Sequence, residues 1–224
     1  MYRLVLSNLL TESVVKLVIV SQASWQLQDN VRQLSTVSGI PTELIEIDYF
    51  TQGPAETVAL ARSHLDPKVP VITGNSDQYV DADLSSFFHA TMDDRVSGSI
   101  LTMLDDDPKW SYAAVTEDGW VTRVKEKEVI SPHATVGIYG FTSAEVMFQA
   151  FELMKQADDH VRGEFYVAPA YNYLINRGEE ISIVDLGPIS TVMYGMGTPE
   201  DYEHFLSTDV SQRAVSRAVA LGLD

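Results

Sequence analysis

The chain has 224 residues, a length that suits one α/β domain with or without a small appendage. Hydrophobic residues make up 45% and charged residues 21%, which is ordinary for a soluble globular protein. Because it has no cysteine, disulfides and thiolate metal sites are excluded. Its formal net charge is −17 and its basic residues are scattered, so we expect no nucleic acid partner. No apolar run approaches the roughly 20 residues of a membrane span. The N-terminus also lacks the basic, apolar and small-residue regions that follow one another in a signal peptide. We therefore expect a cytoplasmic protein without a membrane partner.

Hydrophobic periodicity in the first half predicts helices and strands in alternation. In chain order, we expect a helix at 1–10, a strand at 14–20, a helix at 28–38, a strand at 44–49, a helix at 55–65, a strand at 69–73, a helix at 83–95 and a strand at 97–103. The order β-α-β-α-β between residues 14 and 73 is typical of a parallel, nucleotide-binding half-sheet.

The second half contains more hairpin signals and fewer helices. Asp118-Gly119 lies between two alternating runs, which predicts a β-hairpin with strands at 111–116 and 120–125. We then expect a strand at 134–141, helices at 143–156 and 166–176, strands at 181–185 and 192–196, and helices at 198–206 and 211–221. The two halves together predict an α/β domain with a mixed central sheet flanked by helices.

The most distinctive polar segment follows the predicted strand 69–73. That strand runs directly through Gly74, Asn75 and Ser76 into Asp77. Ligands of open α/β sheets bind outside the carboxyl ends of strands, where a carboxylate can hold Mg²⁺ together with phosphate and water oxygens. The alternative is a turn-forming Asn/Asp segment that caps the next helix.

Two further segments could contact a phosphate or a planar group. Gly53-Pro54 precedes the predicted helix 55–65, where glycine permits close approach and the helix start offers free amides, although Gly-Pro is also an ordinary helix start. On a strand, Arg123, Lys125 and Lys127 would share one face. That face could meet a phosphate, or it could belong to a solvated edge strand that the cations protect.

Two residues of the second half have both a structural and a ligand-binding interpretation. Gly137 lies inside the predicted strand 134–141, which indicates close approach by a ligand or by another backbone. Glu164 could accept hydrogen bonds from sugar hydroxyls, or it could cap the helix that follows it.

Seven short motifs, in order and at their spacing, carry a family resemblance. They are Asn-Ser-Asp-Gln at 75–78, Gly-Ser-Ile-Leu-Thr at 98–102, Asp-Pro-Lys-Trp-Ser-Tyr at 107–112, Glu-Lys at 126–127, Ala-Thr-Val-Gly-Ile-Tyr at 134–139, Gly-Glu-Phe-Tyr-Val at 163–167 and Gly-Met-Gly-Thr-Pro-Glu-Asp at 195–201. From residue 1 to about residue 206, the chain resembles the sugar-phosphate nucleotidyltransferases, especially those of bacterial surface-polysaccharide pathways. The resemblance implies a Rossmann-like GT-A fold.

The resemblance implies a nucleotide and metal side of the site. Asp77 looks like the aspartate that binds Mg²⁺ and so acts in catalysis. Gln52 and Gly53 fall where the family contacts the nucleobase, and Asn75 and Ser76 are counted with them as nucleotide-binding residues.

The resemblance also implies a sugar-phosphate side. Glu126-Lys127 looks like the family's Glu-Lys pair, whose lysine meets the sugar phosphate and assists catalysis. Gly137 and Glu164 fall where the family contacts the sugar. The implied reaction is attack of a sugar 1-phosphate, or a similar phosphate, on the α-phosphate of an NTP, with release of pyrophosphate.

The sequence departs from the family pattern at two places. The family opens with a strand and a Gly-x-Gly-x-Arg loop that cradles the triphosphate, whereas residues 1–10 align with the helix after that loop. The fold would therefore lack its first strand, which in the family lies between strands 14–20 and 69–73. We expect a fragment of a longer protein, a strand supplied by another chain or segment, or direct pairing of the two flanking strands. Gly195 stands where many relatives have a second metal-binding aspartate.

Three functions follow as alternatives. The first is nucleotidyl transfer in surface-polysaccharide precursor synthesis, and the second is a non-catalytic protein that binds a nucleotide or sugar phosphate or complements a partner. The third is a glycosyltransferase that uses a nucleotide-sugar, with Asp81-Ala82-Asp83 as its metal motif. We expect residues 1–206 to form the nucleotidyltransferase-like domain, and residues 207–224 to form an amphipathic helix that docks on this domain or on a partner.

Overall fold

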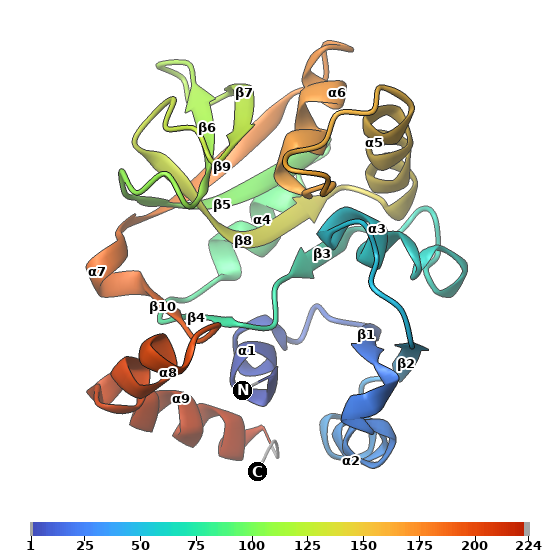
Figure 1. The fold of residues 1–224 in the computed structure, drawn as a ribbon, viewed down its shortest axis with the longest axis vertical. Helices are drawn as coiled ribbons and strands as arrows, with labels where there is room; N and C mark the ends of the chain where they lie inside the picture. The colour runs from blue at the N-terminus through green and yellow to red at the C-terminus, as the bar shows by residue number, and fades with distance from the viewer. Residues whose placement is uncertain (1, 222–224) are drawn as a thin grey trace. The chain divides into compact units, whose positions relative to one another are not determined.

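The structure is a computed structural model that describes residues 2–221. The chain divides into two compact units, and each is built from more than one stretch of sequence. The described part of the first unit comprises residues 2–50, 75–83 and 193–221, and the second comprises residues 51–74 and 84–192. Figure 1 shows the ribbon with its elements labelled.

The first unit contains two small sheets and four α-helices among its described residues (Figure 1). Its elements are α1 (Tyr2–Leu9), β1 (Leu17–Gln22), the 3₁₀-helix η1 (Ala23–Trp25), α2 (Gln28–Ser38), β2 (Thr42–Ile47), β4 (Gln78–Val80), β10 (Met193–Gly195), α8 (Pro199–Leu206) and α9 (Asp209–Ala220). Strands β1 and β2 are parallel, as predicted, with α2 as their crossover. Strands β4 and β10 are antiparallel.

Helix α9 packs within its own unit. Its buried residues Val210 and Ala214 share one apolar cluster with Val5 of α1 and Phe205 of α8. Helix α8 begins as its sequence requires, because the Thr198 hydroxyl accepts the Asp201 N–H at 3.1 Å.

The second unit is a six-stranded mixed sheet with helices packed on it (Figure 1). Its strands are β3 (Val71–Gly74), β5 (Gly98–Leu104), β6 (Ser111–Val115), β7 (Val121–Glu126), β8 (His133–Phe141) and β9 (Ile181–Pro188). Its helices are α3 (Pro54–Ala59), α4 (Ser85–Thr91), α5 (Ala144–Gln156), α6 (Tyr171–Ile175), α7 (Ile189–Val192) and the 3₁₀-helices η2 (Arg62–His64) and η3 (Ala168–Ala170).

The strand order of this sheet is β7-β6-β8-β5-β9, with β3 also paired to β8. Strands β5 and β9 run parallel, and the other pairs are antiparallel. The aromatic core lies between the sheet and the helices: Phe141 stacks on Tyr171 with ring centroids 4.6 Å apart and meets Phe151 edge-on at 6.1 Å. The mixed sheet flanked by helices confirms the predicted fold class.

Several local predictions are confirmed and others are wrong. The hairpin β6–β7 turns at Gly119, whose φ of +85° needs a glycine. The single helix predicted at 166–176 is wrong: η3 and the short α6 stand in its place, and Pro169 lies in the 3₁₀ turn. Strand β3 is antiparallel to β8 and does not continue a parallel half-sheet.

Strands β1 and β3 each have one strand partner among residues 2–221. Strand β1 pairs with β2 alone, and β3 pairs with β8 alone. These two strands belong to different units, so their direct pairing, which was one of three expectations, stays a prediction. Nor does any helix between residues 2 and 221 combine the length and apolar character needed to cross a membrane.

Candidate functional site

The predicted site residues fall into both units. Gln52, Gly53, Lys127, Gly137 and Glu164 belong to the second unit. Three others, Asn75, Ser76 and Asp77, belong to the first unit. The two groups are described separately below.

A tight turn presents Glu164. The backbones of Val161 and Glu164 exchange two hydrogen bonds of 3.0 Å, and the residues between them, Arg162 and Gly163, have φ of +54° and +85°. Positive φ at both central positions defines a type I′ hairpin turn. Glu164 therefore leaves a two-residue hairpin and does not cap a helix, since the next helical segment, η3, has Val167 as its N-cap.

The segment Gln52-Gly53 lies against the residues that follow this turn. The Phe165 N–H donates to the Gln52 carbonyl at 2.7 Å, and the Ala55 N–H donates to the Phe165 carbonyl at 2.9 Å. Gly53 has φ of +115°, and a Cβ built there would lie 2.7 Å from both the backbone N and O of Phe165. The glycine is thus required by a neighbouring backbone, and its predicted contact with a nucleobase stays a prediction.

Lys127 leaves the face on which it was predicted. It follows β7 with a φ of +57°, so the alternation of side chains ends before it. The Lys125 ammonium lies 3.9 Å from Glu128 Oε2. The Lys127 ammonium instead donates to the Tyr166 hydroxyl at 2.7 Å and lies 4.6 Å from the centroid of the Tyr166 ring. The prediction that Arg123, Lys125 and Lys127 share one face is therefore wrong.

Tyr166 joins Lys127 to Glu164. Its hydroxyl accepts from Lys127 and donates to Glu164 Oε2 at 2.5 Å. Burial of the phenol and its hydrogen bond to Glu164 raise the pKa of Tyr166, although Lys127 opposes this shift. A cation and a carboxylate are thus held on one phenol, an arrangement that suits a ligand with both a phosphate and hydroxyl groups.

Glu126 lies beside this group, on the buried side of β7. Its side chain is only 4% exposed, accepts a hydrogen bond from the Ser111 hydroxyl, and has an oxygen 3.9 Å from the Lys127 ammonium. Burial raises the pKa of Glu126, and the nearby negative charge of Glu164 adds to the shift. The predicted Glu-Lys pair is therefore one buried acid next to one partly exposed cation.

Gly137 lies at an irregularity in β8. Between the pairs Ile100–Tyr139 and Thr102–Thr135, β8 contains more residues than β5 does, which makes a β-bulge, and Gly137 has φ of +74° within it. The bulge explains the glycine without a ligand. Its predicted sugar contact stays a prediction.

In the first unit, Asp77 directly precedes β4. Its carbonyl accepts the Met196 N–H at 2.7 Å, and a Cβ built on Gly197 would lie 3.0 Å from Asp77 Oδ2. Asn75 and Ser76 are exposed. Among residues 2–221, His, Asp and Glu side chains nowhere gather in a group of three that could hold a metal. Asp77 fits Mg²⁺ only as a sparse site, in which phosphate and water oxygens supply the other ligands.

In the segment Asp81-Ala82-Asp83, the first carboxylate has a structural role. Asp81 forms an ion pair of 2.5 Å with Arg213 of α9, within the first unit. An aspartate that is neutralised by arginine is a poor ligand for a catalytic metal. This pairing disfavours the glycosyltransferase alternative.

Comparison with known proteins identifies solved structures with a similar overall fold. The sequence matches no family model and no curated protein. Among solved structures, the chain is similar to a nucleoside-diphosphate-sugar pyrophosphorylase from Vibrio cholerae, with a TM-score of 0.71 and 25% identity over 85% of this chain and 80% of the other. It is also similar to the inositol-1-phosphate CTP transferase from T. maritima, with a TM-score of 0.70 and 13% identity over 97% of this chain and 82% of the other.

The chain has a sugar-phosphate nucleotidyltransferase fold. Within this nucleotidyltransferase fold, sequence reasoning missed Tyr166. The motif Gly-Glu-Phe-Tyr-Val contained the residue, but only Glu164 was selected from it. A tyrosine two residues after an acidic side chain, next to a tight turn, is the signal that could have found it.

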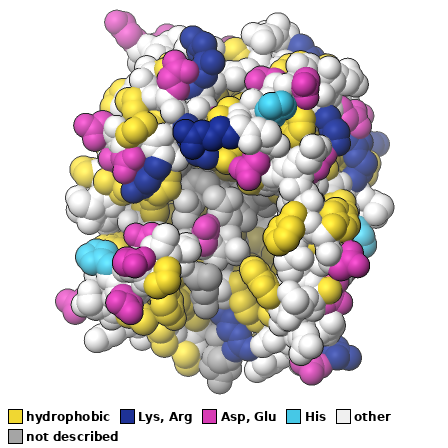
Figure 2. All heavy atoms as spheres, viewed as in Figure 1, with side chains coloured by type: hydrophobic (Ala, Val, Ile, Leu, Met, Phe, Trp, Pro, Cys, Tyr) yellow, Lys and Arg dark blue, Asp and Glu magenta, His cyan; other side chains and the backbone are white. Residues whose placement is uncertain are grey.

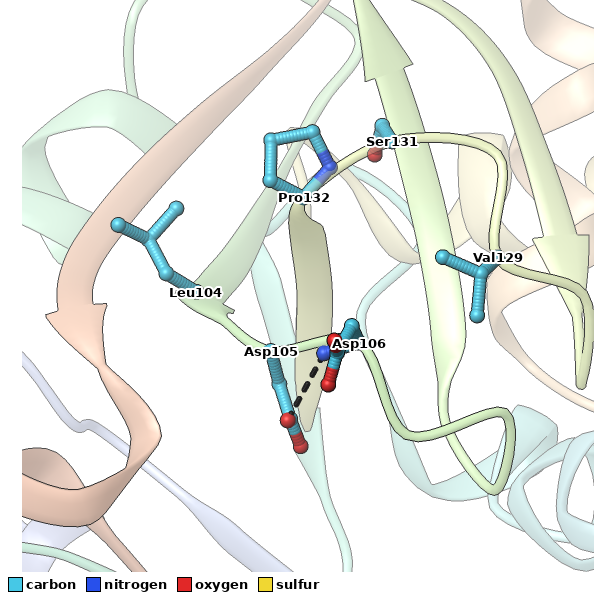
Figure 3. A pocket seen from close by; sticks show the side chains of 6 residues that line it. All are labelled: Leu104, Asp105, Asp106, Val129, Ser131 and Pro132. Atoms are coloured by element: carbon cyan, nitrogen blue, oxygen red, sulfur yellow. Dashed lines mark hydrogen bonds between the residues drawn. The ribbon is translucent and has the colours of Figure 1, made fainter.

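The second unit also has an open hollow of about 610 Å³ at the ends of β5 and β8 (Figure 3). Six residues line it: Leu104, Asp105, Asp106, Val129, Ser131 and Pro132. Asp105 is already engaged, because its Oδ2 accepts the Trp110 indole N–H at 2.6 Å. None of the predicted site residues of the nucleotidyltransferase fold lines this hollow.

Charge on the visible face is dispersed. In Figure 2, Lys and Arg side chains are interspersed with acidic, apolar and neutral groups. An anionic substrate of an acidic protein such as this one is therefore expected to meet a few local cations, and Lys127, which donates to the Tyr166 hydroxyl, is one candidate.

Proposed function

We propose that the chain transfers a nucleotidyl group from an NTP to a sugar 1-phosphate or a similar phosphate. The observation that carries the proposal is the Lys127–Tyr166–Glu164 arrangement, in which hydrogen bonds of 2.7 and 2.5 Å align a cation and a carboxylate. An enzyme of this kind needs a cation for the acceptor phosphate and an acceptor group for sugar hydroxyls. Lys127 and Glu164 supply these two functions.

The proposed chemical step uses positioning and charge neutralisation, without a covalent intermediate on the protein. An oxygen of the acceptor phosphate attacks the α-phosphorus of the NTP, and the bond from that phosphorus to the oxygen bridging to the β-phosphate breaks. Pyrophosphate leaves with the electron pair of that bond. Lys127 orients the attacking phosphate and offsets its charge, and Glu164 and Gly137 contact the sugar.

The nucleotide side of the proposal rests on five residues. In the second unit, Gln52 and Gly53 are the proposed nucleotide contacts. In the first unit, Asn75 and Ser76 are proposed to contact the nucleotide, and Asp77 would hold Mg²⁺. When bound, Mg²⁺ supplies neutralisation of the charge that develops on the phosphates. The likeness to proteins described as nucleoside-diphosphate-sugar pyrophosphorylase and inositol-1-phosphate CTP transferase supports a nucleotide as one substrate.

We further propose a cytoplasmic setting, in surface-polysaccharide precursor synthesis. Among residues 2–221, β1 has β2 as its single strand partner, and this favours a second candidate. In it, the chain binds nucleotide or sugar phosphate and needs a strand from another segment or chain for turnover. The two candidates differ in whether the chain alone releases pyrophosphate.

The test is pyrophosphate release from each NTP combined with a panel of sugar 1-phosphates and Mg²⁺. Replacement of Asp77 by Ala should lower the rate by at least about 100-fold, since it removes the proposed protein ligand of the metal. Asp118→Asn is the matched control, because Asp118 lies exposed in the β6–β7 turn. Nucleotide binding without pyrophosphate release supports the binding protein, and transfer from a nucleotide-sugar supports a glycosyltransferase.

A further inference from the structure

The hydroxyl of Tyr166 bridges two segments that are distant in sequence. Lys127 follows β7, and Glu164 is the last residue of the turn formed by residues 161–164. Lys127 and Tyr166 are 39 positions apart in the sequence. The bonds have fixed polarity: an ammonium can only donate, so the phenol accepts from Lys127 and gives its own proton to Glu164. Each hydrogen bond polarises the Tyr166 hydroxyl, and this strengthens the other hydrogen bond.

The bridge leaves part of each charged group available. Tyr166 takes one of the three ammonium protons of Lys127, and its hydrogen bond engages Oε2 of Glu164. Two N–H donors and the Oε1 acceptor lie outside this bridge. The Lys127 side chain is 28% exposed and has a flexible four-carbon stem, so an unbridged ammonium would sample many positions.

Both backbone segments at the ends of the bridge are held in an uncommon conformation. Lys127 and Arg162 have φ of +57° and +54°, in the left-handed region that non-glycine residues rarely adopt. The Lys127 N–H donates to the Trp110 carbonyl at 2.9 Å, which keeps that strand end in place. Such strain persists where the surrounding structure fixes a residue, and it is concentrated at functional sites.

We propose that Tyr166 is the positioning residue of the sugar-phosphate subsite, through which Lys127 is aimed at the acceptor phosphate and Glu164 at a sugar hydroxyl. The inference rests on the proposed function and deepens it, because it assigns the orientation of both groups to one phenol. The ring itself is a second support for the ammonium, which lies 4.6 Å from its centroid.

The experiment removes only the hydroxyl. Tyr166→Phe keeps the ring and its contact with Lys127, and Tyr173→Phe is the matched control, because the Tyr173 hydroxyl also donates to a carboxylate, Asp159 Oδ2, at 3.0 Å. With the best NTP and sugar 1-phosphate pair, we expect KM for the sugar phosphate to rise about tenfold in Tyr166→Phe, with KM for the NTP unchanged. Tyr173→Phe should match the wild type.

A second set of variants tests whether Tyr166 acts through Lys127 and Glu164. In a background that carries both Lys127→Met and Glu164→Ala, Tyr166→Phe should change KM for the sugar phosphate by less than about twofold, because both groups that it positions are gone. A tenfold effect in that background overturns the proposal. An equal rise in both KM values also overturns it, since that result indicates a general structural defect.

A binding measurement separates this inference from the proposed function. Glucose 1-phosphate is titrated against wild type, Tyr166→Phe and Lys127→Met, and its ³¹P resonance is followed. Wild-type binding that weakens about tenfold in both variants supports the positioning role even if pyrophosphate is never released, and in that case only the proposed function fails. Equal affinity in wild type and Tyr166→Phe, or no wild-type binding, overturns the positioning role.

Discussion

Replacing Gly53 by Ala should disturb stability and the candidate site together. The new Cβ would lie 2.7 Å from both the N and O atoms of Phe165 and 3.1 Å from the Cβ of Glu164, at a φ of +115° that a non-glycine residue rarely adopts. The strained backbone costs about 1–3 kcal/mol. The two backbone hydrogen bonds of Phe165 contribute about 1 kcal/mol each, and the Cβ clash weakens them. We expect the free energy of unfolding to fall by about 2–4 kcal/mol.

The matched control for this prediction is Gly178→Ala. Gly178 lies three residues after the end of α6 and has a φ of +82°, but a Cβ built there meets no atom within 4 Å. Urea unfolding at constant m-value should therefore show about 1 kcal/mol of loss for Gly178→Ala, clearly less than for Gly53→Ala. Equal losses would show that backbone strain alone explains Gly53 and would refute the role of the Phe165 contact.

Three further outcomes follow from packing and charge. Because burial raises the pKa of Glu126, the folded protein keeps a proton that the unfolded chain releases. The free energy of unfolding of the wild type should therefore fall relative to that of Glu126→Gln as the pH rises above 4.5. A difference in unfolding free energy between the two proteins that stays constant between about pH 4 and 8 would contradict this. A Cβ built on Gly140 would overlap the Thr91 side chain, with 2.7 Å between that Cβ and Thr91 Cγ2. The free energy of unfolding of Gly140→Ala, measured in urea, should therefore fall by about 1–3 kcal/mol, and adding Thr91→Ala should recover part of this loss. Arg213→Met removes the ion pair with Asp81, in which the arginine side chain is 58% exposed, so we expect a loss of stability below about 1 kcal/mol. A decrease in Tm larger than about 4 °C would contradict this estimate.

Local rules explain which elements could be predicted from sequence. Thr198 and Pro199 specify the start of α8, because a capping hydroxyl and a proline suit the first turn, and the cap forms as expected. Asp118-Gly119 specifies the β6–β7 hairpin for a similar reason. The order of motifs also predicted the fold, which solved structures with TM-scores of 0.71 and 0.70 support.

Features that depend on distant partners could not be predicted in this way. Strand β4 has only three residues, and it is specified by pairing with β10 far along the chain. The antiparallel placement of β3 depends on β8 and has no signal in the apolar run itself. Gly53 was interpreted through a helix start, although its conformation is required by Phe165.

The candidate site of the second unit is assembled where regular structure stops. A continued β7 would place Lys127 on the face of Arg123 and Lys125, but its φ of +57° turns it to Tyr166. The type I′ turn at Arg162-Gly163 and the +115° φ of Gly53 are similar departures. Periodicity predicts the regular elements, so it is least informative at these residues. Local rules are expected to fail at functional sites, and Lys127 is the residue where that failure has a direct chemical consequence, because the break in alternation is what gives the ammonium its phenol partner.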